Sequence, residues 1–586
     1  MNKRTKIICT IGPAVNSLDL VIQLMRAGMD VARLNFSHGS HEEHLERIEM
    51  LKEARNQLGK PLAIMLDTRG PELRIGKLRE EITLHTGQKW HLLRDEIIGD
   101  EEKVSFTPPH VLESLQKGTK VLFNDGYISS VITEVNEKGV IVELENGGKI
   151  SSGKGVNIPN VSLDLPAITE KDKNDIRFGC ANDVDIIAAS FIRTTDNVIT
   201  IKNLLVEEDS QDIIVIAKIE NTEGVENFDS IIQVADGVMI ARGDLGVEVP
   251  LSRVPSLQKE MIRKSNLAGK PSVTATQMLE SMIHNPRPTR AEVSDVANAI
   301  YDSTSAVMLS GETAIGEYPV ETVKVMTSII TEAEGDFDYR NFFETHSKLI
   351  YHDVPSSVTL ATVKTAYSSH AQAIFAFTNQ GGTARLIARL RPQMPIIAMT
   401  PNVKCFHQMA LNWGVIPYFG NNVTSLVDAF AKISEFAVKR KYVTYGDLVV
   451  VTAGSPFGIS GTTNMMIVEN IGDVLVRGHV GAGKRLHGNI KIVFTTESIQ
   501  PYEVREQIIV IPQCDEHYLP FIQEASGVIL QNHIDDEDSE TFALNAANEL
   551  KKSVIVRADA ATENLKDGQL ITLDPEKALV YKGVVL

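Results

Sequence analysis

Paired cysteines and long apolar runs are both missing from this sequence of 586 residues. The four cysteines, at positions 9, 180, 405 and 514, have no paired spacing, which predicts neither a zinc site nor a disulfide framework and suits a reducing compartment. No apolar run approaches the roughly 20 residues that cross a bilayer. The apolar run 7–11 near the start is too short for a signal peptide. We therefore expect a soluble cytoplasmic protein.

An excess of positive charge is also missing. The chain has 58 Lys and Arg against 76 Asp and Glu, a formal net charge of −18. Nucleic acids and anionic membranes attract basic surfaces, so neither is an expected partner. Hydrophobic residues make up 43% and charged residues 23%, which is typical of a folded chain and excludes a disordered one. This length predicts about four domains.

Eight short, nearly all-apolar runs recur in the first part of the chain, as is typical of parallel strands buried on both faces. They are residues 6–11, 31–35, 62–66, 184–192, 213–219, 237–241, 272–275 and 306–309. Helical spacing follows them; Leu18, Val21 and Met25 share one face after Ser17, the expected helix cap. Eight strand–helix units predict an α/β fold with a (β/α)8 TIM barrel over 1–70 and 157–344.

Three further domains are predicted from other patterns. Residues 71–156 alternate in polarity and break at Asn-Asp-Gly and Asn-Gly-Gly, which indicates antiparallel hairpins and a small inserted β-barrel, a candidate lid. Residues 345–473 contain apolar runs at 373–378, 395–400, 414–419 and 447–454, typical of an open, mostly parallel α/β sheet. Residues 474–586, with runs at 491–496, 508–512, 527–531 and 553–557, predict an extra small α/β domain.

Reactive side chains recur where the predicted barrel strands end, and such groups meet at one mouth of a TIM barrel. In chain order they are Arg33, Asn35 and Ser37; Asp67, Thr68 and Arg74; Ser190; Lys218 and Glu220; Arg242, Gly243 and Asp244; Thr276; Ser310 and Glu312. The cations suit a phosphorylated, anionic substrate, and the acids suit a hard metal ion.

Lys218 and Glu220 share one side of a strand end because alternate residues of a strand share a face. Glu220 and Asp244, one strand along, would give Mg²⁺ two oxygen ligands, with water and substrate phosphate completing its shell. Lys218 would then act as a point charge for a transferring phosphoryl group. A salt bridge at the barrel mouth is an equal alternative from these residues alone. Gly243 lets backbone amides approach an anionic ligand.

Four oxygen-bearing residues, Asn35, Ser37, Asp67 and Thr68, follow adjacent predicted strands. Oxygen ligands with a single carboxylate suit a weakly held monovalent cation. Helix N-capping is the alternative that the residues alone favour. His38 is expected to be a structural hydrogen-bonding residue.

Two glycine-containing loops resemble phosphate sites. Residues 478–484 satisfy G-x4-G-K but lack the following Ser or Thr that would hold Mg²⁺, so nucleotide binding is not expected there. Residues 378–385 form a polar loop between a strand and a helix and end in Arg385. That pattern predicts a phosphate cradle, with a plain turn as the alternative.

Eight motifs, in this order and spacing, closely resemble the pyruvate kinase family over about residues 1–473. They are TKIICTIGPA, GMDVARLNFSHG, LDTRGPELR, KGVNIPN, KIEN, ARGDLGVE, TATQMLESM and MLSGETAIGEYP. The resemblance implies a glycolytic enzyme that transfers the phosphoryl group of phosphoenolpyruvate to ADP, giving ATP and pyruvate. It also implies a homotetramer.

The resemblance assigns roles to individual residues. Lys218, Thr276 and Arg33 would be catalytic, and Arg33, Lys218, Gly243, Asp244, Thr276 and Ser310 would bind substrate. Glu220 and Asp244 would hold Mg²⁺ or Mn²⁺, while Asn35, Ser37, Asp67 and Thr68 would hold K⁺. Arg74, Lys154, Asn35 and His38 would contact the nucleotide. Thr276 would route a proton to the enolate carbon, and a Glu at position 72 goes with K⁺ dependence in the family.

In the family, the loop 378–385 binds a phosphorylated allosteric effector with help from the segment matching 454–463. Thr378, Gly382, Thr383 and Arg385 are the expected effector residues. A sugar phosphate or AMP is the expected ligand.

Residues 474–586 resemble the phosphohistidine domain of phosphoenolpyruvate-utilising enzymes. The Thr-Ser-His motif of that domain would fall near 535–544, where this chain reads DDEDSETFAL, and His533 does not fit the position. We therefore expect a non-catalytic appendage. Three rival functions are a phosphohistidine phosphotransferase, a metal-dependent pyruvate aldolase and a metabolite-binding scaffold. The missing histidine counts against the phosphotransferase. The predicted lid counts against the aldolase, and the converging polar residues count against the scaffold.

Overall fold

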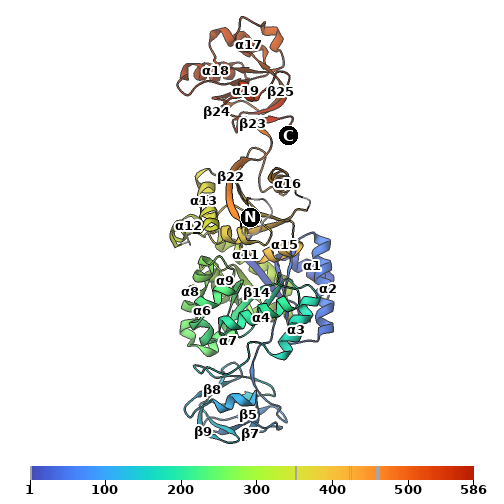
Figure 1. Ribbon diagram of the computed structural model, residues 1–586, viewed down its shortest axis with the longest axis vertical. Coiled ribbons are helices and arrows are strands. Elements are labelled where there is room, and N and C mark those ends of the chain that lie inside the picture. Colours follow the sequence, from blue (N-terminus) through green and yellow to red (C-terminus); the bar gives the residue numbers. More distant parts are fainter. Residues whose placement is uncertain (1–2, 350–352, 422, 424, 456–461, 586) are drawn as a thin grey trace. The chain divides into compact units, whose positions relative to one another are not determined.

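The computed structural model describes residues 3–349, 353–421, 423, 425–455 and 462–585. Eight parallel strands close into a barrel in the order β1-β17-β16-β15-β14-β13-β3-β2 (Figure 1). Their bounds are β1 Lys6–Thr10, β2 Val31–Asn35, β3 Ala63–Asp67, β13 Ile186–Ala189, β14 Ile214–Ile219, β15 Gly237–Ala241, β16 Ser272–Ala275 and β17 Ala306–Leu309. Each overlaps one of the predicted runs, so the TIM barrel is confirmed.

Helices follow the strands and cover the outside of the barrel. They are α1 Leu18–Ala27, α2 His41–Leu58, α3 Glu170–Ala181, α4 Thr195–Glu207, α5 Thr222–Glu226, α6 Phe228–Val234, α7 Arg242–Glu248, α8 Val254–Leu267, α9 Arg290–Tyr301, α10 Gly311–Ala314, α11 Pro319–Gly335 and α12 Tyr339–His346. Ser17 caps α1 as predicted, because its side chain accepts a hydrogen bond from the Leu20 amide.

Alternate residues of each barrel strand face its interior, where residues such as Ile8, Met65 and Met239 form one buried cluster. Ala410 and Leu411 belong to the same cluster, although they come from a 3-10 turn, η5 Met409–Leu411, far along the chain. This turn therefore closes the barrel interior and joins the later α/β segment to the barrel core.

The inserted segment forms a second closed barrel in the order β10-β6-β7-β4-β12-β8-β9, plus a two-stranded sheet, β11-β5. The bounds are β4 Leu73–Ile75, β5 Ile82–Leu84, β6 Lys89–Leu93, β7 Lys103–Thr107, β8 Lys120–Phe123, β9 Ile128–Asn136, β10 Gly139–Leu144, β11 Gly148–Ile150 and β12 Gly155–Asn157. The prediction of antiparallel hairpins is wrong for one pair. Strands β6 and β7 run parallel because the segment 94–102 crosses over between them.

An open five-stranded sheet follows, in the order β20-β19-β18-β21-β22, as predicted for an α/β domain. Its elements are α13 Val354–Ser368, β18 Ala373–Phe377, α14 Gly382–Ala388, β19 Ile396–Thr400, α15 Val403–Gln408, β20 Val415–Phe419, α16 Leu426–Lys439, β21 Leu448–Gly454 and β22 Thr463–Asn470. The sequence analysis missed β22, whose central residues are half-exposed and lack a continuous buried run.

The last segment contains an eight-stranded sheet in the order β23-β30-β29-β25-β26-β27-β28-β24. Its elements are β23 Val474–Arg477, β24 Val480–Ala482, β25 Leu486–Ile492, β26 Ile508–Ile511, α17 Leu519–Glu524, β27 Gly527–Leu530, α18 Glu537–Glu549, β28 Ser553–Val556, α19 Ala561–Asn564, β29 Leu570–Asp574 and β30 Leu579–Lys582. The predicted run 491–496 is misplaced, because β25 ends at Ile492.

By compactness the chain divides into two units. One comprises Met1–Val363, Ala376–Val423 and Ala453–Met465, and the other comprises Lys364–Phe375, Thr424–Thr452 and Met466–Leu586. The four predicted domain ranges remain predictions. Among the residues described, no helix has both the length and the apolar character needed to cross a membrane.

The last segment lacks the geometry of the two phosphate motifs considered for it. Residues 480–482 form β24 and β25 begins at Leu486, so no helix N-terminus follows Lys484 to face a phosphate. Helix α18 occupies most of 535–544, and His533 is an exposed residue paired with Asp535.

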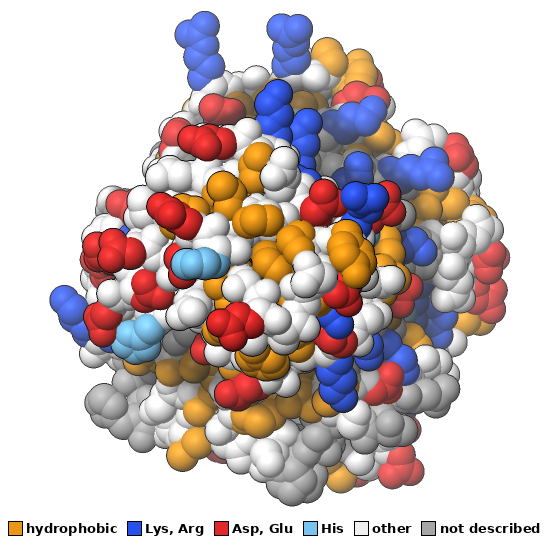
Figure 2. Space-filling model, turned by 90° about the horizontal axis from the view of Figure 1, so that it is seen from above, with side chains coloured by type: hydrophobic (Ala, Val, Ile, Leu, Met, Phe, Trp, Pro, Cys, Tyr) orange, Lys and Arg blue, Asp and Glu red, His pale blue; other side chains and the backbone are white. Residues whose placement is uncertain are grey.

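Acidic, basic and hydrophobic side chains are mixed on the face drawn in Figure 2, and neither sign of charge covers that face alone.

A buried histidine makes the contact between α15 and the barrel dependent on pH. The Leu62 amide donates to Nδ1 of His407 at 3.3 Å, and burial lowers the pKa of His407 from 6.5 to about 3. The unfolded chain therefore takes up a proton as pH falls below about 6.5, whereas the folded chain resists it. Stability should fall with pH over that range, by about 1–2 kcal/mol from this residue at pH 5.

His407→Asn keeps an acceptor for the Leu62 amide but does not titrate. We expect the fall in thermal midpoint between pH 7.5 and 5.5 to be shallower in His407→Asn than in the parent, measured by differential scanning fluorimetry. His85→Asn, at an exposed histidine of the inserted barrel, is the matched control. Equal slopes for the parent and His407→Asn would rule this explanation out.

Candidate active site

A buried carboxylate, Asp67, joins side chains from three neighbouring barrel strands. It lies at the end of β3 and is fully buried. Arg33 of β2 donates through Nε to Asp67 Oδ2 at 2.5 Å, and Lys218 of β14 donates through Nζ to Oδ1 at 3.0 Å. The Ser190 hydroxyl, just after β13, donates to Oδ1 at 3.3 Å. The predicted convergence of Arg33, Asp67, Ser190 and Lys218 at one mouth is therefore present.

The ammonium group of Lys218 has an oxygen partner for each of its three N–H bonds. Its Nζ lies 2.6 Å from Ser190 Oγ, 3.0 Å from Asp67 Oδ1 and 3.0 Å from Glu220 Oε1. Burial alone would lower the pKa of Lys218, but Asp67 and Glu220 outweigh burial and raise it above its ordinary value. Lys218 is therefore a fixed positive charge, and the salt bridge predicted as the alternative is formed.

Glu220 and Asp244 are carboxylates with too little positive charge around them. Burial, together with the nearby charge of Asp244, raises the pKa of Glu220 to about 7, although Lys218 opposes the rise. Burial likewise raises the pKa of Asp244. Oε2 of Glu220 accepts a hydrogen bond from the Phe191 amide at 2.6 Å. A divalent cation between the two carboxylates would supply the missing charge, so these residues fit a metal ion.

The described part of the chain contains no group of three or more His, Cys, Asp or Glu residues arranged to hold a metal. A site with only two carboxylate ligands leaves most of an octahedral shell to water and to a ligand. That is how Mg²⁺ is commonly bound beside phosphate groups.

Thr276 follows β16 in a strained backbone conformation. Its φ is +71° and that of Gln277 is +53°, which side-chain-bearing residues rarely adopt. The Gly243 amide donates to Thr276 Oγ1 at 2.8 Å, so these two predicted substrate residues lie in contact. The guanidinium of Arg242 donates to Asp295 Oδ1 at 2.8 Å and to the Thr276 carbonyl at 2.8 Å. Arg242 thus holds the strained turn, a role that the sequence analysis missed.

The four oxygen-bearing residues proposed for a monovalent cation lie at the ends of β2 and β3, where Asn35 is the register partner of Asp67. The Asn35 side chain accepts from the Ser37 amide at 3.1 Å, and Thr68 Oγ1 accepts from the Ser190 amide at 3.1 Å. The Asn35 bond closes a turn, but the helix N-capping of the alternative interpretation is wrong for these residues, because Ser40 caps α2 and Thr68 bonds to the segment after β13.

Ser310 lies at the end of β17, where its amide donates to Glu312 Oε2 at 2.7 Å. Glu312 is fully buried and its other oxygen accepts from the Leu279 amide at 3.0 Å. Glu312 therefore fixes the loops after β16 and β17 instead of facing a ligand.

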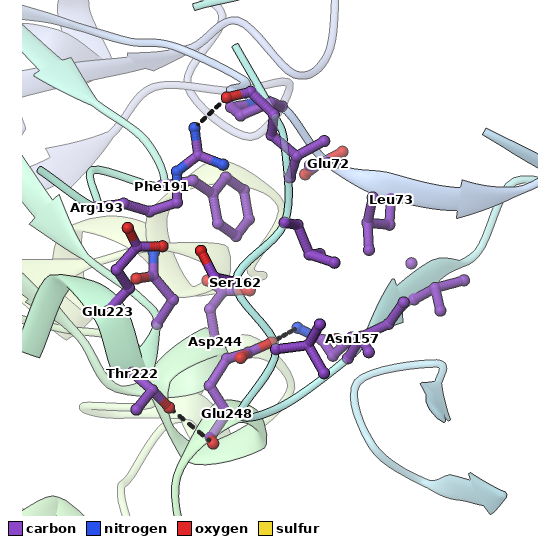
Figure 3. Close-up of a pocket in the computed structure, with 18 of the residues that line it drawn as sticks. Glu72, Leu73, Asn157, Ser162, Phe191, Arg193, Thr222, Glu223, Asp244 and Glu248 are labelled. Atoms are coloured by element: carbon purple, nitrogen blue, oxygen red, sulfur yellow. Dashed lines mark hydrogen bonds between the residues drawn. The ribbon is translucent and has the colours of Figure 1, made fainter. Parts of the chain in front are cut away.

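A cavity of about 860 Å³ lies between the barrel mouth and the inserted barrel (Figure 3). Four of the predicted site residues line it: His38, Arg74, Lys154 and Asp244. Arg74 donates to Glu72 at 2.7 Å and to the Gly153 carbonyl at 2.7 Å. Lys154 Nζ makes no hydrogen bond to any described residue, so its charge is available to a ligand in the cavity.

The inserted barrel is joined to the helix that carries Asp244. The Asn157 amide group donates to Glu248 Oε1 at 2.9 Å, and the Thr222 hydroxyl donates to the Glu248 carbonyl at 3.3 Å (Figure 3). Sequence reasoning missed this contact, because Asn157 and Glu248 are far apart in the chain and the motifs that contain them do not show which residues meet in space.

The predicted effector residues lie just after β18 and in α14, and their bonding partners differ. Thr383, in α14, is buried and its Oγ1 lies 2.6 Å from Thr463 Oγ1. The Thr378 amide is bonded within the sheet to the Met399 carbonyl, and Gly382 begins α14. Arg385 donates to the Gln380 carbonyl and lines a cavity against the barrel. Most of the predicted partner loop, 456–461, lies outside the described residues.

Comparison with known proteins matches two parts of the chain to family models. The sequence pattern described as "Pyruvate kinase, barrel domain" matches residues 2–323, and that described as "Pyruvate kinase, alpha/beta domain" matches residues 356–469. A pyruvate kinase of Geobacillus stearothermophilus is 43% identical over 586 residues, 100% of this chain and 99% of that protein. Those of Sporosarcina psychrophila and Staphylococcus haemolyticus are 42% and 41% identical, each covering 99% of both chains. The last segment is thus shared with these relatives.

The two carboxylates should bind a divalent ion directly. We expect Glu220→Gln and Asp244→Asn each to weaken Mn²⁺ binding at least about tenfold, because each removes one of two anionic ligands. Isothermal titration or the electron paramagnetic resonance signal of free Mn²⁺ measures this. Glu226→Gln, an exposed position lining the same cavity, is the control and should bind normally. Parent-like affinity in both site variants would place the metal elsewhere.

Proposed function

The chain belongs to the pyruvate kinase family, and from this premise we propose how its barrel mouth transfers the phosphoryl group of phosphoenolpyruvate to ADP, giving ATP and pyruvate. The observation that supports this most strongly is the fixed ammonium of Lys218, held between Asp67, Ser190 and Glu220 beside Asp244. Phosphoryl transfer requires mainly positioning and charge neutralisation, and this mouth supplies both.

Lys218 is the group proposed to face the transferring phosphoryl. Its ammonium cannot rotate freely, because three oxygens hold it, so it needs little reorganisation as charge moves on the phosphoryl oxygens. Arg33 is held by Asp67 and by the Thr10 hydroxyl at 2.8 Å, which aims its guanidinium at an anionic substrate. When Mg²⁺ or Mn²⁺ is bound, Glu220 and Asp244 would hold it, and it would neutralise oxygen charge on the substrate.

Thr276 is proposed to pass a proton, through water, to the carbon of the enolate left when the phosphoryl departs. Its hydroxyl donates to the Ala275 carbonyl at 2.6 Å and accepts from the Gly243 amide. The strained turn, fixed by Arg242, keeps this hydroxyl beside Gly243 and Asp244. The proton passes from a water to carbon, that water takes a proton from solvent in turn, and Thr276 orients the water.

Asn35, Ser37, Asp67 and Thr68 are proposed to hold K⁺, which would add a second positive charge at the phosphoryl. The pairing of Asn35 with Asp67 at the adjacent ends of β2 and β3 supports this. Glu72, which accompanies K⁺ dependence in the family, is paired with Arg69 at 3.1 Å and with Arg74. Replacing K⁺ by Na⁺ in an assay of pyruvate formation addresses this proposal.

The rival functions gain no support from the site. A phosphohistidine enzyme needs a histidine where α18 now has an acidic first turn. A metal-dependent aldolase would leave Lys154 and the inserted barrel without a role. We also propose a cytoplasmic homotetramer acting at the last step of glycolysis, and light scattering would measure the subunit number.

Removal of the Lys218 charge should abolish turnover. We expect Lys218→Met to lower kcat by about 10²–10⁴, as for loss of a main electrostatic stabiliser, in a coupled assay of pyruvate formation from phosphoenolpyruvate and ADP. Lys173→Met, at a half-exposed lysine of α3 paired with Glu170, is the control. Unchanged kcat in Lys218→Met would exclude it from the reaction, and pyruvate release without ADP would refute the proposed function.

Lys154 is proposed to bind nucleotide phosphate from the side of the inserted barrel, with Arg74, Asn35 and His38. We expect Lys154→Met to raise the KM for ADP by about 10-fold, because one charge-assisted contact is lost, while the KM for phosphoenolpyruvate changes little. Lys149→Met, an exposed lysine in the same barrel, should leave both values unchanged. A rise confined to the KM for phosphoenolpyruvate would contradict this assignment.

An effector site is proposed beside Thr383, at the start of α14. A phosphorylated ligand such as a sugar phosphate or AMP should lower the concentration of phosphoenolpyruvate that gives half-maximal rate. Thr383→Val removes the hydroxyl bonded to Thr463 but keeps the side-chain shape, so we expect it to weaken activation and not basal kcat. A rate curve that no such ligand shifts would refute the site.

A further inference from the structure

Four cationic side chains line one small cavity. It lies where α14 and the residues after it pack against the barrel residues that precede β16 and β17. The four side chains are Lys270, Arg385, Arg389 and Arg391, and the cavity volume is about 10 Å³. The other lining residues are neutral, among them Asn266, Ser305 and Asn412. No carboxylate of the described chain belongs to this lining.

Two of the arginines have buried N–H groups without a partner. Arg389 is 5% exposed, and its Nε and Nη2 make no hydrogen bond. Arg391 is 2% exposed and lies over the Trp413 ring at 4.5 Å; its Nη atoms are bonded, but its Nε is not. A buried donor without an acceptor costs free energy, and a buried charge costs more, so native proteins rarely keep such groups unsatisfied.

The carboxylates that act electrostatically on these four cations are engaged elsewhere. Asp236 pairs with Lys202 at 2.9 Å, Glu334 accepts from the amides and the hydroxyl around Thr5, and Asp353 caps α13 through Ser356. The positive charge around the cavity is thus not compensated locally. In agreement, burial lowers the pKa of Arg391 to about 9 and that of Lys270 to about 8.

We propose that this cavity binds one small monovalent inorganic anion, chloride in the simplest case. The space is small, about 10 Å³, which favours one small ion over phosphate or a carboxylate metabolite. A water molecule could accept two of the free N–H groups but would leave the charges uncompensated. A halide ion accepts hydrogen bonds from several donors and carries the charge that the lining lacks.

The anion would connect two parts of the compact unit. Arg389 and Arg391 follow α14, whereas Asn266 and Lys270 lie at the end of α8 and before β16 of the barrel. Arg391 already bridges them, since its Nη2 donates to Asn266 Oδ1 at 2.9 Å and to the Ser303 carbonyl at 2.7 Å. Chloride should therefore stabilise the packing of α14 against the barrel, independently of any substrate, metal or effector.

The first test compares thermal unfolding of the full chain in sodium chloride and in sodium gluconate at equal ionic strength. We expect chloride to raise the midpoint by at least about 1 °C, because a ligand of the folded state stabilises by mass action. In Arg389→Met, which keeps much of the side-chain length, the chloride effect should vanish. It should persist in Arg287→Met, at an exposed arginine. An equal chloride effect in parent and Arg389→Met would overturn the proposal.

The second test does not depend on a variant that folds. Crystals of the parent protein soaked in sodium bromide should show an anomalous peak in the cavity among Lys270, Arg389 and Arg391. A fully soaked crystal with bromide at other positions and none in this cavity would overturn the proposal. Neither test measures turnover. A failure of the anion-site proposal can therefore be distinguished from a failure of the proposed kinase activity.

Discussion

The buried ammonium of Lys218 sets the arrangement of the barrel mouth. Each of its three N–H bonds points to an oxygen from a different strand end: Asp67 after β3, Ser190 after β13 and Glu220 after its own strand, β14. Charges buried this deeply are tolerated only when they are paired and hydrogen-bonded. The spacing of three barrel strands and the positions of two carboxylates are therefore tied to one side chain.

This network leaves a defined shortage of positive charge. Asp67 is shared between Arg33 and Lys218, while Lys218 is the cation that lowers the pKa of both Glu220 and Asp244. The barrel therefore presents a rigid, anionic pair next to a fixed cation. The inserted barrel contributes different groups, Arg74 and Lys154, across the 860 Å³ cavity, and the Asn157–Glu248 contact joins the two. Phosphoryl transfer requires mainly such positioning and charge neutralisation.

The sequence was sufficient to predict elements whose buried faces make continuous apolar runs. All eight barrel strands are of this kind, and the strand-end rule then located Asp67, Lys218, Glu220 and Asp244 together. Elements without such a run were missed or misplaced, as β22 and the end of β25 show. The direction of a side chain also could not be predicted from the sequence. Arg242 is in a strand-end motif, yet its guanidinium binds Asp295. Contacts between distant segments, such as Asn157 with Glu248 or Arg391 with Asn266, leave no local pattern in a single sequence.

The central claim is that Glu220 and Asp244 share one divalent ion beside Lys218. Anomalous diffraction from crystals grown with Mn²⁺ measures this directly. The account predicts a single strong peak about 2.0–2.2 Å from a carboxylate oxygen of each residue, with Lys218 still bonded to Asp67. A peak bound by only one of the two carboxylates, or at another part of the chain, would contradict it.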